Sequence, residues 1–237
     1  MMKVAIILQA RMGSTRLPGK TLKPLLGKPF LMHIVERLRL CKNAEKIIVA
    51  TSIEPKDDAI ELFCRSKGIP VFRGSEADVL DRYYRCAKTF DINTIVRITA
   101  DNPLVDWENI DEMITSHIDK DADITYTEGM PYGTGLGNCV MSFQAIEKVR
   151  SIAKENNETP DPDDLILERP EMFKINVLQA HHKLQRNYRL TVDYPEDFQL
   201  MEVLFAQFVG IPDLKEVVSF LDNHPEVVAI NKNIGKN

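Results

Sequence analysis

Residues 3–20 read KVAIILQARMGSTRLPGK, and the two parts of this stretch differ in character. Residues 4–8 are apolar without alternation, a pattern typical of a strand that is covered on both faces of a parallel sheet. Residues 9–20 contain two glycines, a proline, three cations and no acid, which favours a loop. The stretch therefore predicts a central parallel strand that ends in a cationic loop.

The alternation of apolar strands and amphipathic helices continues along the chain. Helical patterns are found at residues 30–41, 57–67, 78–90 and 109–120, and short apolar segments follow them at 46–51, 70–72, 94–99 and 123–127. This order predicts an α/β sandwich, a mostly parallel sheet with helices on both faces. Ligands of such folds bind beyond the carboxyl ends of the strands. We therefore expect the loops after residues 10, 51, 72 and 99 to line one site.

The middle of the chain is less regular. Residues 129–137 contain four glycines and a proline, and residues 158–170 contain three prolines and five acids, on either side of a helical pattern near 144–156. After it, the pattern predicts a strand at 189–192 and helices at 195–208 and 214–221. We expect one domain over residues 1–237, with residues 129–187 as a small inserted lobe.

The charge distribution points to a small anionic ligand. The chain has 237 residues and a net charge of −5, but residues 1–28 carry six basic side chains and no acid. The other 209 residues carry 24 basic and 35 acidic side chains. An acidic body argues against non-specific nucleic acid binding, which needs a broad basic surface. A basic pocket in such a body favours a compact anion instead.

The remaining composition is that of an ordinary soluble protein, with 44% hydrophobic and 27% charged residues. The apolar run at 4–8 is too short for a membrane span, so we expect no membrane segment and a cytoplasmic location. The four cysteines lack a C-x-x-C pair, which predicts buried, reduced thiols rather than a metal or redox site: Cys41, Cys64, Cys86 and Cys139.

The loop at 9–20 has the groups that a polyphosphate site requires. Backbone N–H groups near Gly13 and Ser14 can donate hydrogen bonds, and Arg11, Arg16 and Lys20 supply positive charge. The alternative is that these cations are solvated surface charges. Three cations without an acid, at the carboxyl end of a buried strand, favour the polyphosphate site.

Residues 13–21 look like a P-loop, but the match fails in two respects. Five residues separate Gly13 from Gly19, whereas the P-loop motif has four. Pro18 also removes an amide where the phosphate cradle needs donors. We therefore exclude a P-loop.

Two aspartates follow predicted strands. Asp101 lies in RITADNPLVD at 97–106, and Asp193 lies in RLTVDYPEDF at 189–198. A carboxylate at a strand end that faces a polyphosphate loop suits Mg²⁺, which takes one or two carboxylates and shares its other positions with phosphate and water. The alternatives are turn chemistry for Asp101 and helix capping for Asp193. We assign Glu196 and Asp197 only to the start of the helix.

Together, these motifs and FRGSEADVLDRYYR at 72–85 resemble the cytidylyltransferase family. The family includes the spore coat polysaccharide biosynthesis protein F group, to which the match is closest, and the 3-deoxy-manno-octulosonate and acylneuraminate cytidylyltransferases. The resemblance implies a Rossmann-like fold of the nucleotide-diphospho-sugar transferase type. It also implies Mg²⁺-dependent transfer of a cytidylyl group from CTP to a sugar or sugar acid, with release of pyrophosphate, for cell-surface or spore-coat polysaccharide.

The resemblance also implies roles for single residues. Asp101 and Asp193 would hold Mg²⁺, and with Arg11 and Lys20 they form the expected catalytic set. The expected nucleotide-binding residues are Gln9, Ala10, Gly13, Ser14, Arg16, Arg73, Gly74, Ser75, Asp78, Leu80 and Thr99.

Residues 73–80 have an alternative interpretation. The resemblance places them beside the nucleoside, and small residues before a helix suit close approach to a planar base. They could equally form a helix cap at Ser75, with Tyr83 and Tyr84 half buried behind it.

The resemblance fades where the acceptor sugar and a homodimer contact are expected, in the lobe at 129–187. The spore coat group would have a glutamate-bearing segment and an Arg-Glu-His run there, but this chain reads GTGLGNCVMS at 133–142 and ETPDPDDLILERPE at 158–171. Two other functions therefore stay open. A glycosyltransferase would usually carry Asp-x-Asp, which residues 101–103 lack, and a non-catalytic nucleotide-binding protein would have no need for both Asp101 and Asp193.

Overall fold

A seven-stranded sheet forms the centre of the computed structural model, which describes residues 3–134, 138–156 and 159–234. Its order is β5-β4-β1-β6-β8-β7-β9. β8 is antiparallel to both of its neighbours and all other pairs are parallel. The strands are β1 (Val4–Gln9), β4 (Lys46–Ser52), β5 (Val71–Gly74), β6 (Thr94–Thr99), β7 (Ile124–Glu128), β8 (Cys139–Ser142) and β9 (Ile175–Gln179).

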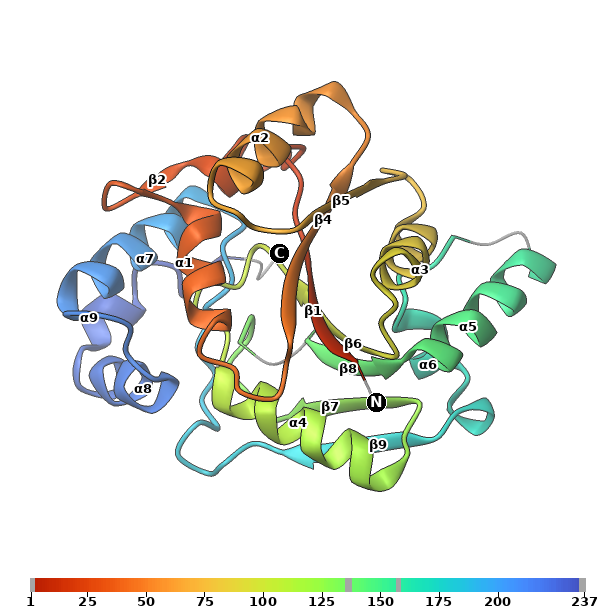
Figure 1. The fold of residues 1–237 in the computed structure, drawn as a ribbon. Coiled ribbons are helices and arrows are strands. Elements are labelled where there is room, and N and C mark those ends of the chain that lie inside the picture. Colours follow the sequence, from red (N-terminus) through yellow and green to blue (C-terminus); the bar gives the residue numbers. More distant parts are fainter. Residues whose placement is uncertain (1–2, 135–137, 157–158, 235–237) are drawn as a thin grey trace.

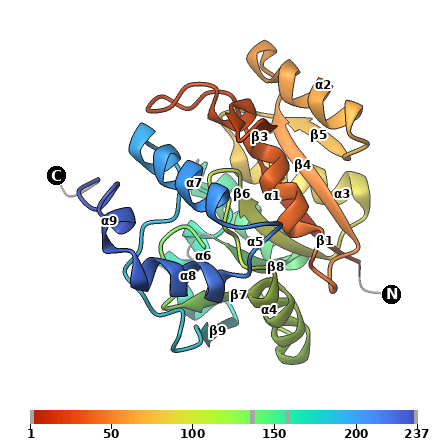
Figure 2. The same cartoon turned by 90° about the vertical axis from the view of Figure 1, so that its left-hand side faces the viewer.

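Helices cover both faces of this sheet (Figure 1). One apolar core lies under α1 (Phe30–Leu38), α2 (Asp58–Ser66), α4 (Trp107–Lys120), α7 (Pro195–Gln207), α8 (Leu214–Asn223) and α9 (Pro225–Val228). The other lies under α3 (Val79–Phe90), α5 (Phe143–Asn156) and α6 (Asp164–Glu168). Figure 2 shows α7, α8 and α1 layered in front of the sheet. Short 3₁₀ turns lie at Lys20–Leu22, Pro55–Asp57 and Pro170–Met172, and β2 (Pro24–Leu25) and β3 (Lys28–Pro29) form a small hairpin.

The first strand shows why the apolar run does not alternate. In β1, Val4, Ile6 and Leu8 belong to one core, and Ala5 and Ile7 belong to the other. Both faces of the strand are therefore buried, as the sequence predicts. The α/β fold with a mostly parallel sheet is confirmed.

Residues 129–187 supply two strands of the central sheet. β8 inserts between β6 and β7, and β9 adds to the outer edge beside β7. The helices α5 and α6 lie in the same part of the chain. Its predicted roles in acceptor binding and dimerisation stay predictions.

The prediction of a strand at residues 189–192 is wrong. The segment is extended, but it makes only an isolated bridge between Tyr132 and Arg189. The N–H groups of Leu190 and Val192 donate to different places, the carbonyl oxygens of Tyr132 and Asp101, each at 2.8 Å. Because the two partners belong to separate loops, no continuous ladder forms among the described residues.

The cysteines are free, as predicted. Cys64, Cys86 and Cys139 are buried and Cys41 is partly exposed. Burial raises the pKa of the Cys86 thiol to about 12, which keeps it protonated and unreactive. Within the described ranges, each helix is too short or too polar to cross a membrane.

His117 predicts an acid-dependent loss of stability. It is buried between α4 and β7, where Nδ1 lies 3.0 Å from Thr125 Oγ1, and burial lowers its pKa to about 4. An unfolded histidine titrates near pH 6.5, so protons favour the unfolded chain as the pH falls from about 6.5 to about 4. Between pH 7 and pH 5 we expect the wild type to lose about 2 kcal/mol relative to His117→Asn, which retains a hydrogen-bonding group. Urea unfolding at both pH values measures this difference, and parallel pH profiles would contradict it.

Candidate active site

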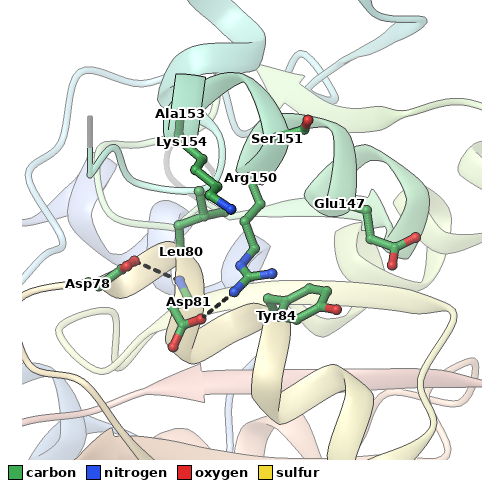
Figure 3. A pocket seen from close by; sticks show the side chains of 9 residues that line it. All are labelled: Asp78, Leu80, Asp81, Tyr84, Glu147, Arg150, Ser151, Ala153 and Lys154. Atoms are coloured by element: carbon green, nitrogen blue, oxygen red, sulfur yellow. Dashed lines mark hydrogen bonds and ion pairs between the residues drawn. The ribbon is translucent and has the colours of Figure 1, made fainter. Parts of the chain in front are cut away.

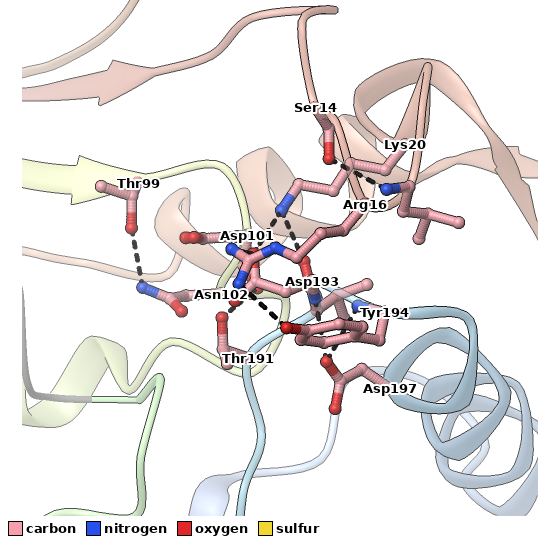
Figure 4. A network of polar contacts seen from close by, with 12 residues as sticks. Ser14, Arg16, Lys20, Thr99, Asp101, Asn102, Thr191, Asp193, Tyr194 and Asp197 are labelled. Atoms are coloured by element: carbon pink, nitrogen blue, oxygen red, sulfur yellow. Dashed lines mark hydrogen bonds and ion pairs between the residues drawn. The ribbon is translucent and has the colours of Figure 1, made fainter. Parts of the chain in front are cut away.

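The four predicted catalytic residues meet in one hollow at the carboxyl ends of β1 and β6, which we name the strand-end pocket. Figure 4 shows three of them, Lys20, Asp101 and Asp193, with their polar neighbours. Its volume is about 220 Å³. It is lined by Gln9, Arg11, Gly13, Ser14, Thr15, Arg16, Lys20, Thr21, Thr99, Ala100, Asp101 and Asp193. Except for Ala10, every site residue predicted in the loop at 9–20 lines this pocket, as does Thr99. Ala10 is buried in the core instead, and its N–H donates to the carbonyl oxygen of Ala50 at 3.1 Å.

The loop at 9–20 is fixed by groups outside it and within it. Asp57, which is fully buried, accepts a hydrogen bond from the Met12 N–H at 2.7 Å. Thr21 Oγ1 donates to the carbonyl oxygen of Arg11 at 2.7 Å. The Ser14 N–H, expected to face a ligand, donates to the Met12 carbonyl oxygen at 2.9 Å, so the loop itself uses it. The cations therefore project from an ordered backbone.

Three cations surround Asp193. Lys20 Nζ and Arg16 Nη2 each lie 3.2 Å from Asp193 Oδ1, and Arg189 Nη2 lies 3.2 Å from Oδ2. Lys20 also donates to the carbonyl oxygen of Val192 at 2.5 Å. Figure 4 shows Lys20 and Arg16 pointing toward Asp193. These contacts set three cationic groups around one carboxylate at the edge of the pocket.

One carboxylate oxygen of Asp101 has no partner in the part of the protein that the structure describes. This atom, Oδ1, is buried and accepts no hydrogen bond from the described residues, and the same holds for Gln9 Oε1. A buried polar atom left unpaired is costly, so both atoms are suited to a ligand. Asp101 Oδ1 fits a hard cation such as Mg²⁺, which prefers carboxylate oxygens and keeps positions for phosphate and water.

The predicted nucleoside residues separate into two groups. Arg73, Gly74 and Ser75 line a second hollow of about 1200 Å³, which shares Arg11 with the strand-end pocket. The guanidinium of Arg73 is engaged by the protein, however. Its Nε donates to the Ser52 carbonyl oxygen at 2.8 Å, and its other two nitrogens bind Asp58, Glu61 and the Glu54 carbonyl oxygen. Arg73 thus links β4 to α2, and its guanidinium nitrogens bind protein groups rather than the hollow.

Asp78 and Leu80 line a different hollow of about 480 Å³ between α3 and α5 (Figure 3). Asp78 caps α3, because its Oδ1 accepts the Asp81 N–H at 2.7 Å. Arg150 crosses this hollow to Asp81 at 3.2 Å and stacks over the Tyr84 ring. The structure therefore places Asp78 and Leu80 apart from the catalytic set.

The helix cap predicted at Ser75 is displaced by one turn. Ser75 Oγ accepts the Asp78 N–H at 3.0 Å, so Ser75 supports the capping residue rather than the helix itself. Tyr83 is completely buried and Tyr84 is intermediate, so the expectation of two half-buried tyrosines is wrong for Tyr83. Tyr83 faces the sheet, where Ile7 and its neighbours exclude solvent.

Sequence reasoning missed Arg189 and Asn231 and underrated Asp197. Asp197 does lie in the first turn of α7 and helps to cap it, since its Oδ2 accepts hydrogen bonds from the N–H groups of Asp193 and Tyr194 at 3.0 Å each. It also binds Arg189 Nε at 2.9 Å. Burial alone would raise the pKa of Asp197, but hydrogen bonds from Arg189, Asp193 and Asn231 outweigh it and hold the pKa below its usual value. The sequence did contain a signal for these contacts. Arg189, Asp193 and Asp197 are spaced four residues apart, and one basic side chain is thus followed by two acidic side chains with which it can pair.

Gly133 allows the closest backbone approach at this site. Its φ is +92°, and a Cβ there would lie 2.5 Å from the Thr191 backbone nitrogen. Thr191 is two residues before Asp193, so the position of Asp193 depends on a residue without a side chain at 133.

Gly133→Ala is therefore expected to destabilise the protein by at least about 2 kcal/mol, because the backbone must shift in addition to the strain of a positive φ. Gly210→Ala is the matched control. Gly210 has φ +88° with nothing within 4 Å, so only the strain, about 1 kcal/mol, applies. Urea denaturation of both variants compares the losses, and equal losses would show that the approach at Thr191 is unimportant.

Comparisons with known proteins show what the chain is similar to. The chain is 35% identical over 230 residues to the spore coat polysaccharide biosynthesis protein SpsF of Bacillus subtilis (strain 168), covering 94% of this chain and 95% of that protein. It is 34% identical over 117 residues to an 8-amino-3,8-dideoxy-manno-octulosonate cytidylyltransferase of Shewanella amazonensis, 48% of this chain and 46% of that one. The solved structure of a cytidylyltransferase from Leptospira borgpetersenii superposes with a TM-score of 0.88 at 30% identity, covering 96% of this chain and 97% of that one.

The extent of these matches differs. Similarity to SpsF runs along nearly the whole chain, whereas similarity to the sugar-acid enzyme covers about half of it. A family model described as cytidylyltransferase matches residues 5–222, which include the cationic loop, Asp101 and Asp193. These matches favour nucleotidyl transfer over the glycosyltransferase and non-catalytic alternatives. The chain belongs to the cytidylyltransferase family.

Proposed function

We propose that the protein transfers a cytidylyl group from CTP to a hydroxyl of a sugar or sugar acid, with Mg²⁺, and releases pyrophosphate for polysaccharide synthesis. The observation that carries the proposal is the strand-end pocket, where cations of one loop lie beside two carboxylates and Asp101 Oδ1 has no partner among the described residues. The name of the Bacillus subtilis relative supports polysaccharide synthesis as the pathway.

The cations suit the outer phosphates of CTP. Lys20 and Arg16 each lie 3.2 Å from the Asp193 Oδ1 atom. A phosphate oxygen in the same pocket would pair with their charged ends at a similar distance. Arg11 lines both this pocket and the neighbouring larger hollow, which is the proposed place of the nucleoside. Arg11, Arg16 and Lys20 would stabilise the charge that builds up on pyrophosphate as it leaves.

Asp101 and Asp193 would hold Mg²⁺. When bound, the ion supplies charge neutralisation at the α-phosphate and a lower pKa for the attacking hydroxyl. Gln9, whose unpaired Oε1 lines the same pocket as Asp101, would donate or accept a hydrogen bond at the reacting groups. Positioning by these residues contributes most to the rate, because in-line phosphoryl displacement requires little covalent chemistry from the protein.

The proposal extends to the surroundings of the reaction. The lobe at 129–187 would bind the acceptor and form a homodimer contact. Free cysteines and the use of CTP fit a reducing compartment that contains nucleotides, so we also propose a cytoplasmic location.

Asp101→Asn tests the metal role without knowledge of the acceptor. In calorimetric titrations, the wild type is expected to bind CTP at least about tenfold more tightly with Mg²⁺ than with EDTA. Residues that only orient the ligands of a metal already change its affinity by that factor when they are mutated, and loss of the metal itself should have no smaller effect. The amide that this substitution introduces cannot replace the carboxylate, so the variant should lose this gain and bind CTP in EDTA as well as the wild type does.

Asp91→Asn is the control. Asp91 pairs with Lys3, outside the pocket, and its φ of 55° suits asparagine. An undiminished Mg²⁺ effect in Asp101→Asn would refute the metal assignment. Tighter binding of UTP than of CTP by the wild type would refute the choice of nucleotide.

A further inference from the structure

Asp193 contacts a group of mostly buried side chains that the proposed reaction does not use directly, which we name the brace. The brace consists of Arg189, Asp197 and Asn231. Arg189 precedes α7, Asp197 lies in its first turn, and Asn231 follows α9. Asp197 is 0% exposed and Asn231 is 3% exposed. Three separate segments thus close around one carboxylate beneath the strand-end pocket.

Both oxygens of Asp197 are saturated with hydrogen bonds. Oδ1 accepts from Arg189 Nε at 2.9 Å and from Asn231 Nδ2 at 2.8 Å. Oδ2 accepts from Arg189 Nη2 at 3.1 Å and from the N–H groups of Asp193 and Tyr194 at 3.0 Å each. Asn231 Nδ2 also donates to the Arg189 carbonyl oxygen at 3.0 Å. The arginine is therefore fixed at its backbone as well as at its guanidinium.

The same guanidinium reaches Asp193. Arg189 Nη2 lies 3.2 Å from Asp193 Oδ2, while Lys20 and Arg16 contact Oδ1. One planar group with several donors can hold two carboxylates at once, which a single ammonium cannot do in the same geometry. With Oδ2 engaged, Oδ1 is the oxygen that faces the loop cations.

We propose that Arg189 is a positioning residue that orients Asp193 so that Oδ1 faces the strand-end pocket for Mg²⁺. The inference rests on the proposed function, because it assigns a role within that same site. Groups that orient a metal's ligands typically change its affinity by about 10–100-fold when they are removed. Arg189 does not line the strand-end pocket, so its removal is expected to change the affinity for the metal and not for the nucleotide.

Two variants test this role while preserving the fold. Arg189→Gln with Asp197→Asn removes both charges of the buried pair together, so neither is left uncompensated. Arg189→Lys retains the positive charge beside Asp197 but loses the fork that reaches Asp193. For each folded variant, CTP binding is titrated at a series of Mg²⁺ concentrations and in EDTA. We expect about 10–100-fold weaker apparent Mg²⁺ affinity and unchanged CTP affinity in EDTA.

Arg186→Gln is the matched control. Arg186 lies three residues earlier and makes a similar ion pair with Asp222 at 3.0 Å, but that pair is part-exposed at the surface. We expect this variant to behave like the wild type. If Mg²⁺ affinity is unchanged in either folded Arg189 variant, or if CTP affinity in EDTA falls equally, Arg189 has only a structural role and the proposal is overturned. If the wild type itself shows no Mg²⁺-dependent CTP binding, it is the proposed function that fails.

Discussion

The ion pairs of the Asp193 carboxylate hold the candidate active site together. Lys20, 173 positions earlier in the chain, and Arg189, four positions earlier, both contact this carboxylate. Ion pairs that are removed from water stabilise a fold only when each charge keeps its partners. The cations that contact Asp193 keep such partners, because Asp197 compensates Arg189 and the backbone carbonyl oxygen of Val192 accepts a hydrogen bond from Lys20. The result is a charged site that exists before any ligand binds.

The parallel sheet brings these distant groups together. β1 pairs with β6 in a register that sets Gln9 beside Thr99, so the cationic loop and Asp101 leave the sheet at the same edge. The segment with Asp193 then joins them through the hydrogen bond from the Val192 N–H to the Asp101 carbonyl oxygen. Gly133 permits this arrangement, because a side chain there would meet Thr191. The site is thus assembled by backbone contacts, and its side chains add the charge.

Sequence patterns predicted the parts of this arrangement that follow from strand ends. The apolar run before Gln9 and the strand before Asp101 place both residues at one edge of the sheet, and the resemblance added Asp193. The same patterns could not show which way a side chain turns. Arg73 belongs to a family motif, yet its guanidinium bonds to β4 and α2. The contacts that Asp57 and Asn231 make at the site had no local signal, since Met12 lies 45 positions from Asp57 and Asp197 lies 34 positions from Asn231.

The strand at 189–192 was mispredicted for a related reason. An apolar stretch before an aspartate looks the same in sequence whether its N–H groups bind one neighbouring strand or two separate loops. In this protein the N–H groups of residues 190 and 192 bind two different loops, and the segment is therefore joined to both Tyr132 and Asp101. Strand-end rules also predict nothing about residues 133–142 and 158–171, although the family model matches the chain through both segments.

If the proposed metal site is right, Asp193 is shared between the loop cations and a metal ion. Titration of Mn²⁺ into the nucleotide-free protein, followed by the electron paramagnetic resonance signal of the free ion, tests it most directly. Lys20 and Arg16 occupy Oδ1 in this state, so the wild type should bind Mn²⁺ weakly, and Arg16→Gln should bind it several-fold more tightly because a repelling charge is gone. Equally tight binding by both proteins would show that the cations and the metal do not compete for Asp193, and would contradict the account.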